Sequence, residues 1–221
     1  MRPNENRKKA EKKPNPFEPK GVAGTLYTML HDMVCMLAVI TVAFIFFTRL
    51  VGVNGSSMYP TLVGAQEYSE ASGDYLVLRS NFLKTTYEQG DIVVACVPDF
   101  ENGKPIVKRV VATGGQTVSF RSGEDGWIHV WVDGELQSES FINEPMEPRG
   151  VGTDGNSLTV PEGCYFLMGD NRNNSTDSRY NDIGMVDGRY IVGKALLLVF
   201  PGQDYRQNDR RDWSRLGDIY D

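Results

Sequence analysis

The chain has 221 residues, and its 40% hydrophobic and 24% charged residues are ordinary for a globular protein, which excludes disorder of the whole chain. Its net charge of −6 is uneven, because residues 1–30 hold seven basic and three acidic side chains whereas residues 50–221 hold 15 basic and 25 acidic ones. An acidic body with two histidines and no CxxC pair lacks the cation excess that binds nucleic acid and the ligands that bind metal, so we expect neither partner, and no cofactor.

The chain begins with a polar segment followed by an apolar one. Residues 1–24 are basic and rich in proline, and we predict that they form a disordered tail. Residues 33–48 carry no charge, but 16 helical residues reach only about 24 Å. We therefore extend the predicted span to residue 53, which requires Arg49 to turn its guanidinium toward the membrane interface. Residues 25–53 are assigned to a juxtamembrane segment, with a short interfacial helix over 22–32, and a transmembrane anchor.

All seven basic residues of the tail precede the apolar segment, and this predicts its orientation. Positive charge is retained on the cytoplasmic side, so we expect a single-pass protein of the plasma membrane with a cytoplasmic N-terminus and everything beyond residue 54 outside the cell. The basic tail also suits an anionic lipid bilayer. Two alternatives are a buried core helix and a cleaved signal peptide. The length of the basic region and the charge of Arg49 favour an uncleaved anchor.

Residues 54–201 read as a body of β-strands. Short β-branched runs separated by turn residues predict strands at 74–78, 91–97, 106–112, 116–120, 127–132, 164–168 and 190–200. Asp133-Gly134 suits a hairpin turn. Without helices to connect parallel strands, the sheets should be antiparallel, so we predict an all-β body with one N-terminal transmembrane helix. Residues 202–221 are predicted to be a flexible polar tail. Cys96 and Cys164 lie in strand-like stretches, where they either pair or serve as two small buried hydrophobic residues.

Four stretches of the body carry groups suited to chemistry. The first, Gly55-Ser-Ser-Met-Tyr-Pro-Thr-Leu62, holds serines in a turn, and the second, Gly90-Asp-Ile-Val-Val94, leads into a strand. In the third, Lys108 and Arg109 interrupt an apolar strand. Neighbours on a strand point to opposite faces, so one of the two charges must face inward unless the strand lies at an exposed edge. A buried ammonium loses its proton readily and becomes a base at neutral pH.

The fourth stretch, Gly169-Asp-Asn-Arg-Asn-Asn-Ser-Thr-Asp-Ser-Arg-Tyr180, is polar but rich in side chains that hydrogen-bond their own backbone. Such a composition indicates an ordered loop, in which Asp177 and Arg179 can form an ion pair. Together and in this order, the four stretches resemble the type I signal peptidases, membrane-bound serine proteases that remove signal peptides from exported proteins. The resemblance runs from about residue 33 to about residue 201.

The resemblance implies roles for individual residues. Ser57, which precedes Met58, would be the nucleophile, and Lys108 its general base. Ser175 would orient the Lys108 amine, and the Asp177–Arg179 pair would support the site, with Asp170 and Arg172 in the same loop. Some members have a serine at the position of Gly55 whose hydroxyl helps to bind the oxyanion. Gly55 lacks that hydroxyl, so the backbone N–H of Ser57 would serve instead.

The resemblance also implies the substrates, which are secretory preproteins with small side chains at the first and third positions before the cut. They would bind as an extended strand whose small pockets are lined by Val53, Met58, Leu62 and Val107, although core packing also explains apolar residues there. Two other interpretations stay open at this point. One is a membrane-tethered β module without activity, and the other is an SOS-repressor-type Ser/Lys autoprotease, which would carry a helix-turn-helix in place of the membrane span.

Overall fold

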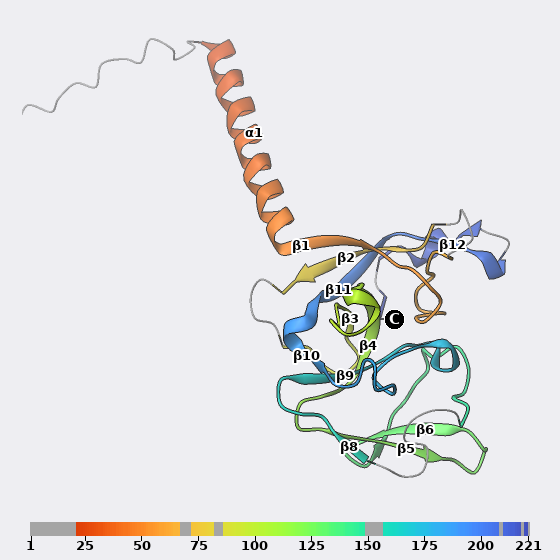
Figure 1. The fold of residues 1–221 in the computed structure, drawn as a ribbon. Helices are drawn as coiled ribbons and strands as arrows, with labels where there is room; N and C mark the ends of the chain where they lie inside the picture. The colour runs from red at the N-terminus through yellow and green to blue at the C-terminus, as the bar shows by residue number, and fades with distance from the viewer. Residues whose placement is uncertain are drawn as a thin grey trace, which may run out of the picture. The chain divides into compact units, whose positions relative to one another are not determined.

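The computed structural model describes residues 21–66, 72–81, 86–148, 157–207, 210–217 and 219–220 (Figure 1). The chain divides into two compact units, Met1–Ile45 and Phe46–Asp221. The predicted disordered tail lies almost wholly outside the described residues. Its last residues enter the helix that follows.

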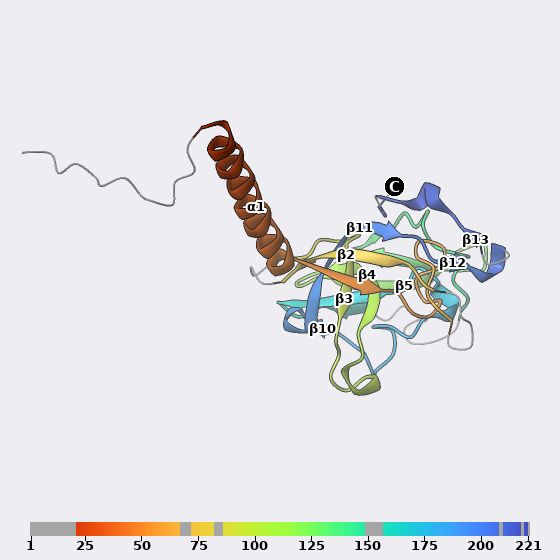
Figure 2. The ribbon, with the colours of Figure 1, turned by 90° about the horizontal axis from the view of Figure 1, so that it is seen from above.

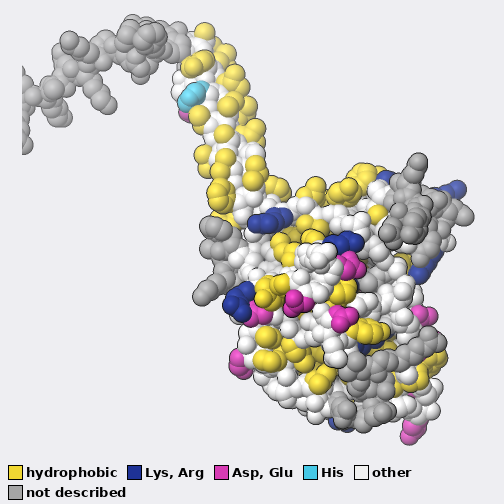
Figure 3. Space-filling model, in the orientation of Figure 1, with side chains coloured by type: hydrophobic (Ala, Val, Ile, Leu, Met, Phe, Trp, Pro, Cys, Tyr) yellow, Lys and Arg dark blue, Asp and Glu magenta, His cyan; other side chains and the backbone are white. Residues whose placement is uncertain are grey.

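The first unit contains one helix, α1, which spans Val22–Phe47. Its 26 residues correspond to a length of about 39 Å, and its most apolar 18-residue window has a mean hydropathy of 2.2. Hydrophobic side chains cover the helix along its length (Figure 3), and His31 and Asp32 are its exposed polar pair. The helix is long and apolar enough to cross a membrane. The segment predicted as a separate interfacial helix, residues 22–32, is the first part of the same helix.

The predicted extension of the membrane span to residue 53 is wrong. Strand β1 (Thr48–Gly52) starts directly after α1 and pairs antiparallel with β2 (Tyr75–Ser80), so that Arg49 lies opposite Leu78. The extension had been required because 16 residues were too few to span the bilayer. Since the helix begins at Val22 instead, that requirement disappears, and the β-branched residues after Phe47 are available for a sheet.

The body consists of two main antiparallel sheets, as predicted. The larger has the strand order β1-β2-β11-β3-β4-β9-β10, and the smaller has the order β7-β6-β5-β8 (Figures 1 and 2). All seven predicted strands are present, with their ends shifted by at most two residues. The strands beyond β1 and β2 are β3 (Ile92–Ala95), β4 (Ile106–Thr113), β5 (Thr117–Ser122), β6 (Ile128–Val132), β7 (Glu135–Leu136), β8 (Ser157–Thr159), β9 (Cys164–Met168), β10 (Val186–Asp187) and β11 (Ile191–Phe200).

The larger sheet is covered on both faces. Along β3, Ile92 and Val94 belong to one hydrophobic cluster, whereas Val93 and Ala95 belong to a second. Alternate residues of a strand point to opposite faces, so every residue of β3 is buried. A third cluster lies between the two sheets and joins Phe166 of the larger sheet to Phe120 of the smaller one. The neighbouring strand β4 is buried along positions 107–112 as well, so its charged side chains lie in the interior on both faces.

The predicted flexible tail is packed in its described residues. It contains the strand pair β12 (Gln203–Asp204) and β13 (Arg210–Arg211), and the short 3₁₀ turns Tyr205–Gln207 and Trp213–Arg215. Gly217 exchanges backbone hydrogen bonds with Leu198 of β11, and Ile219 is buried in a core cluster. These contacts could not be predicted from the composition, because the segment is mostly polar and the apolar residue that anchors it, Ile219, belongs to no periodic apolar pattern.

The three cysteines are free thiols. Cys96 follows β3 and Cys164 begins β9, and both are half-buried. Burial raises the pKa of the Cys164 thiol. Of the two alternatives, small partly buried hydrophobic residues and a disulfide, the structure therefore agrees with the first.

Candidate active site

Ser57 lies beside Lys108 of β4, in the Ser57 loop, which is residues 53–63 of the connection between β1 and β2. The Ser57 hydroxyl oxygen is 2.7 Å from the Lys108 amine nitrogen, although the two residues are 51 positions apart in the sequence. The turn before Ser57 depends on Gly55, whose φ of +76° lies in the left-handed region that glycine adopts without strain. The Gly55 N–H donates to the Ala65 carbonyl at 2.9 Å, which closes the loop at its base.

Two further glycines allow other backbone segments to approach this loop. A Cβ atom at Gly64 would lie 1.7 Å from the Gly55 carbonyl oxygen, and a Cβ atom at Gly169 would lie 2.4 Å from the Ser57 carbonyl oxygen. Neither position can hold a side chain without moving the backbone. The close approach at Gly169 also allows the Asn171 N–H to donate to the Ser57 carbonyl at 3.0 Å. The polar loop after β9 is thereby joined to the loop that carries Ser57.

Lys108 is buried and has no carboxylate against its amine. Its side chain is 4% exposed, and the amine donates to Ser57 Oγ and to the Val107 carbonyl at 3.1 Å. Among the described residues no ion pair involves Lys108. Burial lowers the pKa of Lys108 to about 8 from its ordinary value of 10.5. A large fraction of the amines is therefore neutral slightly above neutral pH, which is the state a general base requires.

Arg109, the next residue, is also buried, with 5% of its surface exposed. The alternation of side chains along a strand predicted that one of these two cations would face inward. The alternative interpretation, an exposed edge strand with both side chains in water, is wrong. Arg109 donates twice to the Asp170 carboxylate, at 2.9 and 2.7 Å, and once to the Gly90 carbonyl at 2.9 Å. Its guanidinium also lies 4.0 Å from the centre of the Phe141 ring. Since β4 is covered on both faces, both cations are buried, but only Arg109 is neutralised by an acid.

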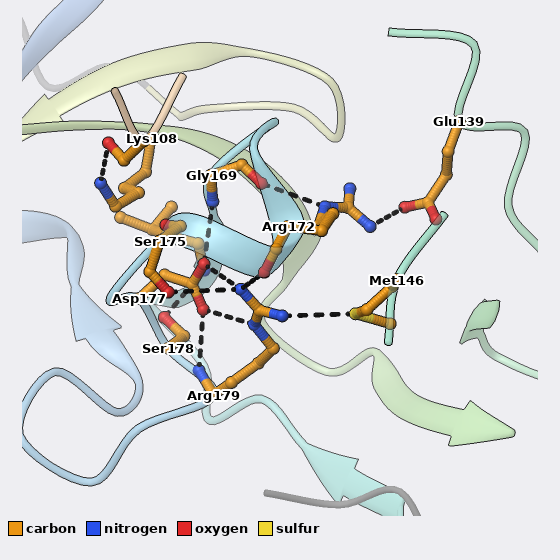
Figure 4. Close-up of polar contacts among 11 residues, drawn as sticks. Lys108, Glu139, Met146, Gly169, Arg172, Ser175, Asp177, Ser178 and Arg179 are labelled. Carbon is orange, nitrogen blue, oxygen red and sulfur yellow. Dashed lines mark hydrogen bonds and ion pairs between the residues drawn. The ribbon is translucent and has the colours of Figure 1, made fainter. Parts of the chain in front are cut away.

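The predicted ion pair between Asp177 and Arg179 is present and buried (Figure 4). The Arg179 guanidinium donates to both oxygens of Asp177, at 2.8 and 2.9 Å, and also to the Arg172 carbonyl at 2.7 Å. Asp177 in turn accepts from the Gly169 N–H at 3.0 Å. This pair holds both ends of the loop after β9 together, and Gly169 at one end contacts the Ser57 backbone.

Ser175 lies in this loop close to Gly169. Its hydroxyl oxygen is buried and has no hydrogen-bond partner among the described residues, and no hydrogen bond links it to Lys108. A Cβ atom at Gly169 would lie 2.3 Å from the Ser175 hydroxyl oxygen. The structure thus brings Ser175 to the wall of the site without the direct bond to the amine that its predicted role requires. A buried hydroxyl without a partner costs free energy, so it marks a place where a further group is needed.

The sequence analysis missed several residues that hold the site. Asn171 donates its side-chain amide to the Ser56 carbonyl at 3.0 Å, and Asn174 donates to the Ser56 hydroxyl at 2.8 Å. Arg172 pairs with Glu139, a residue from outside the four stretches. The two asparagines lay within the polar loop already singled out. Glu139 had no local signal, because its partner is 33 residues away.

The N–H of Ser57 donates to no acceptor within the described part of the chain, which leaves it available to a bound group. Gly55 is exposed and has no side chain to offer a hydroxyl. The predicted pocket residues Val53, Met58, Leu62 and Val107 all belong to one core cluster and are 2, 1, 0 and 8% exposed. None of the four lines the cavity of about 400 Å³ near the loop, which is bounded in part by Thr61. The described residues contain no cluster of three metal-ligating side chains.

Comparison with known proteins supports the interpretation of the four stretches. Residues 26–200 match the family described as signal peptidase, peptidase S26. Signal peptidase I of Bacillus licheniformis is 31% identical over 179 residues, covering 79% of this chain and 87% of that protein. Signal peptidase I U of Bacillus subtilis (strain 168) is 31% identical, covering 79% and 90%. A crystal structure of a signal peptidase I from Enterococcus faecalis V583 is 28% identical with a TM-score of 0.39, covering 50% of this chain and 97% of that one.

Proposed function

The chain belongs to the signal peptidase family, peptidase S26, and from this premise we propose that Ser57 and Lys108 are the nucleophile and the general base with which it removes signal peptides from secretory preproteins. It is a membrane-bound serine endopeptidase of the signal peptidase I type. One observation carries the assignment of the two residues: the Ser57 hydroxyl lies 2.7 Å from a buried amine whose pKa is lowered to about 8.

In the first step the neutral Lys108 amine removes the hydroxyl proton of Ser57 while the oxygen attacks the carbonyl carbon of the peptide bond. The amine keeps one N–H on the Val107 carbonyl, which holds its lone pair toward Ser57. The N–H of Ser57 donates to the oxyanion as negative charge develops on the carbonyl oxygen. With glycine at position 55, this backbone donor replaces the hydroxyl that some family members have there.

The tetrahedral intermediate then collapses. The C–N bond breaks, and the Lys108 ammonium gives its proton to the departing amine, so that the mature chain leaves with a neutral N-terminus and the signal peptide stays on Ser57 as an ester. Lys108 is neutral again and removes a proton from a water molecule, which attacks the ester carbonyl. Collapse of the second intermediate returns the proton from Lys108 to Ser57 and frees the signal peptide as a carboxylic acid, which then loses its proton to water.

The polar loop after β9 supports these two residues. We propose that Ser175 orients the amine by accepting its second N–H, because its hydroxyl is buried and unpartnered at the wall of the site. The Asp177–Arg179 pair holds the loop against the Ser57 backbone through Gly169. These residues act on the chemistry through Ser57 and Lys108 and not on the substrate.

We further propose that small substrate side chains at the first and third positions before the cut lie against Val53, Met58, Leu62 and Val107. The four side chains are 0–8% exposed, so any pocket that they floor is shallow and admits only small groups. The extended substrate would run along the segments that carry Ser57 and Lys108, where backbone groups would bind it as an added strand.

We propose that α1 anchors the protein in the plasma membrane with its N-terminus in the cytoplasm. The seven basic residues that precede the helix support this orientation. The catalytic body, residues 54–201 and the segment after it, would then face the outside, where exported preproteins emerge. The contact with lipid is part of the same proposal.

The two alternatives have lost their support. An autoprotease of the SOS-repressor type would carry a helix-turn-helix before its catalytic body, whereas the described residues before β1 form the single helix α1. A β module without activity would not need a buried, unpaired amine beside a serine, since such a charge costs stability without any return in binding or packing.

The test is cleavage of a purified preprotein by the full chain in detergent. We expect Ser57→Ala and Lys108→Ala each to lower kcat/KM by about 10⁴-fold, as for other residues of a catalytic pair. Ser56→Ala is the matched control, because Ser56 neighbours the nucleophile but its hydroxyl accepts from Asn174. This control should keep activity within about tenfold of the wild type. Full activity in either of the first two variants would overturn the assignment.

A further inference from the structure

The segment after residue 200 lies outside the part of the chain that matches the family, yet it contacts the body at several points. Its backbone pairs with β11 through Gly217 and Leu198. The Tyr220 hydroxyl donates to the Ala195 carbonyl at 2.7 Å and accepts from the Ile92 N–H at 3.1 Å. These contacts fix the segment on the sheet that carries Lys108, so it can influence the site.

Arg215 of this segment reaches the loop that carries Ser57. Its guanidinium donates to both oxygens of Asp74, at 3.1 and 2.7 Å, and to the Thr61 carbonyl at 3.0 Å. Thr61 follows Ser57 by four positions. The fork of the guanidinium thus joins an acid outside the loop to the backbone inside it, which a lysine ammonium cannot do with the same geometry.

Asp74 is fully buried and binds the loop on both sides of Ser57. Its carboxylate accepts from the Val63 N–H at 2.8 Å and from the Gly202 N–H at 2.6 Å. Its backbone carbonyl accepts from the Val53 N–H at 2.8 Å. Val53 and Val63 are the two ends of the loop, so Asp74 fastens both of them. Arg215 neutralises this carboxylate and adds a third contact to the loop, at the Thr61 carbonyl.

The same loop is also bound on the side of the general base. The Thr61 hydroxyl donates to Asp170 at 2.6 Å, and Asp170 pairs with Arg109, the neighbour of Lys108. Thr61 is therefore held through its carbonyl by the Arg215–Asp74 pair and through its hydroxyl by the Arg109–Asp170 pair. These two attachments at Thr61 add to the hydrogen bonds that Asn171 and Asn174 make with Ser57 and Ser56.

We propose that Arg215 is a positioning residue of the active site, which sets the Ser57 hydroxyl against the Lys108 amine by holding the Ser57 loop through Thr61 and Asp74. Its hydrogen bonds go to Asp74 and Thr61, and none goes to the Ser57 hydroxyl or the Lys108 amine. The inference rests on the proposed roles of Ser57 and Lys108. It assigns the segment beyond the family match a part in catalysis that the family motifs do not contain.

The test compares Arg215→Lys with Arg211→Lys in the full chain, using cleavage of a purified preprotein in detergent. Arg211 lies in the same segment but donates to the Pro201 carbonyl and the Ser72 hydroxyl, away from the Ser57 loop. Rates are measured well below the melting temperature of each variant and are divided by the folded fraction from circular dichroism. We expect Arg215→Lys to lower kcat about tenfold with KM within about twofold, because small displacements of a nucleophile act on the chemical step. Arg211→Lys should keep the wild-type kcat.

A wild-type kcat per folded molecule for Arg215→Lys would overturn the proposal and leave Arg215 with stability alone. A change confined to KM, or an equal loss of kcat in Arg211→Lys, would overturn it too. If Arg215→Lys does not fold, the double variant Asp74→Asn/Arg215→Gln takes its place. It removes both charges together with the guanidinium that joins Asp74 to Thr61, and its kcat and KM are compared in the same way. Ser57→Ala in the same assay separates the two levels: an active Ser57→Ala overturns the proposed function, whereas an inactive one beside a normal Arg215→Lys overturns only the positioning role.

Discussion

Lys108 and Arg109 are neighbours on β4, equally buried, and opposite in their electrostatic surroundings. Arg109 is bound by the Asp170 carboxylate, the Gly90 carbonyl and the face of Phe141, so its charge is compensated. The Lys108 amine donates only to the Ser57 hydroxyl and the Val107 carbonyl among the described residues, and burial lowers its pKa to about 8. Burial alone therefore does not turn a cation into a general base. A buried lysine becomes a base only where no carboxylate pairs with its amine.

The first test replaces Lys108 by Met, which has a similar length and no charge. We expect kcat/KM for preprotein cleavage to fall about 10⁴-fold, because the base is gone. Stability at pH 7 should nevertheless rise by about 1–3 kcal/mol, because a lysine whose pKa is lowered from 10.5 to about 8 costs the folded state free energy. Urea unfolding measures the second effect. If Lys108→Met is less stable than the wild type, the charge of the Lys108 ammonium is stabilised in the folded protein more than its contacts indicate.

The second test replaces Arg109 by Met. Here we expect the opposite sign, a loss of about 3–5 kcal/mol of stability, because Asp170 would be left as a buried charge without its cation. The double variant Arg109→Met/Asp170→Asn is the control, and it should recover part of the loss in the same urea experiment. If Lys108→Met and Arg109→Met shift stability in the same direction, the contrast between the two cations is wrong.

The third test uses pH, because the two cations differ in whether they titrate. Activity requires the neutral Lys108 amine, so kcat/KM should fall as pH drops through about 8 and be about a hundredfold below its plateau at pH 6. The difference in the free energy of unfolding between the wild type and Lys108→Met has its full size below pH 8, where Lys108 is charged in both the folded and the unfolded state. It narrows between pH 8 and about 10.4, where the folded state loses its proton first. An activity limb near 10 would mean that the amine is not desolvated.

The smallest expected effect concerns the loop that faces Lys108. We expect Ser175→Ala to lower kcat about tenfold and to move the activity limb to lower pH, because a lost acceptor of the amine N–H destabilises its charged form. Ser178→Ala is the matched control, since the Ser178 hydroxyl accepts from the Leu167 N–H in the same loop. It should cost about 1 kcal/mol of stability and leave kcat and the limb unchanged. Equal pH profiles for Ser175→Ala and the wild type would remove the orienting role of Ser175.

Much of the molecule follows from local patterns in the sequence. The apolar run predicted a helix that can cross a membrane, and the β-branched runs predicted the seven strands, because periodicity and turn residues act within a few positions of the chain. The order of the four polar stretches indicated the family and the identity of Ser57 and Lys108. The Asp177–Arg179 pair was accessible for the same reason, since its partners are two positions apart.

The remaining features depend on contacts between distant parts of the chain. The helix ends at Phe47 because the next residues pair with β2, and Arg109 is buried because β4 is covered on both faces. The segment after residue 200 is packed through Ile219 and Arg215, and most of their partners lie more than 100 positions away. The proton affinity of Lys108 belongs to this second group. The sequence identifies Lys108 as the candidate base. Its pKa depends on which segments bury the amine and on whether a carboxylate pairs with it, and only the folded structure decides both.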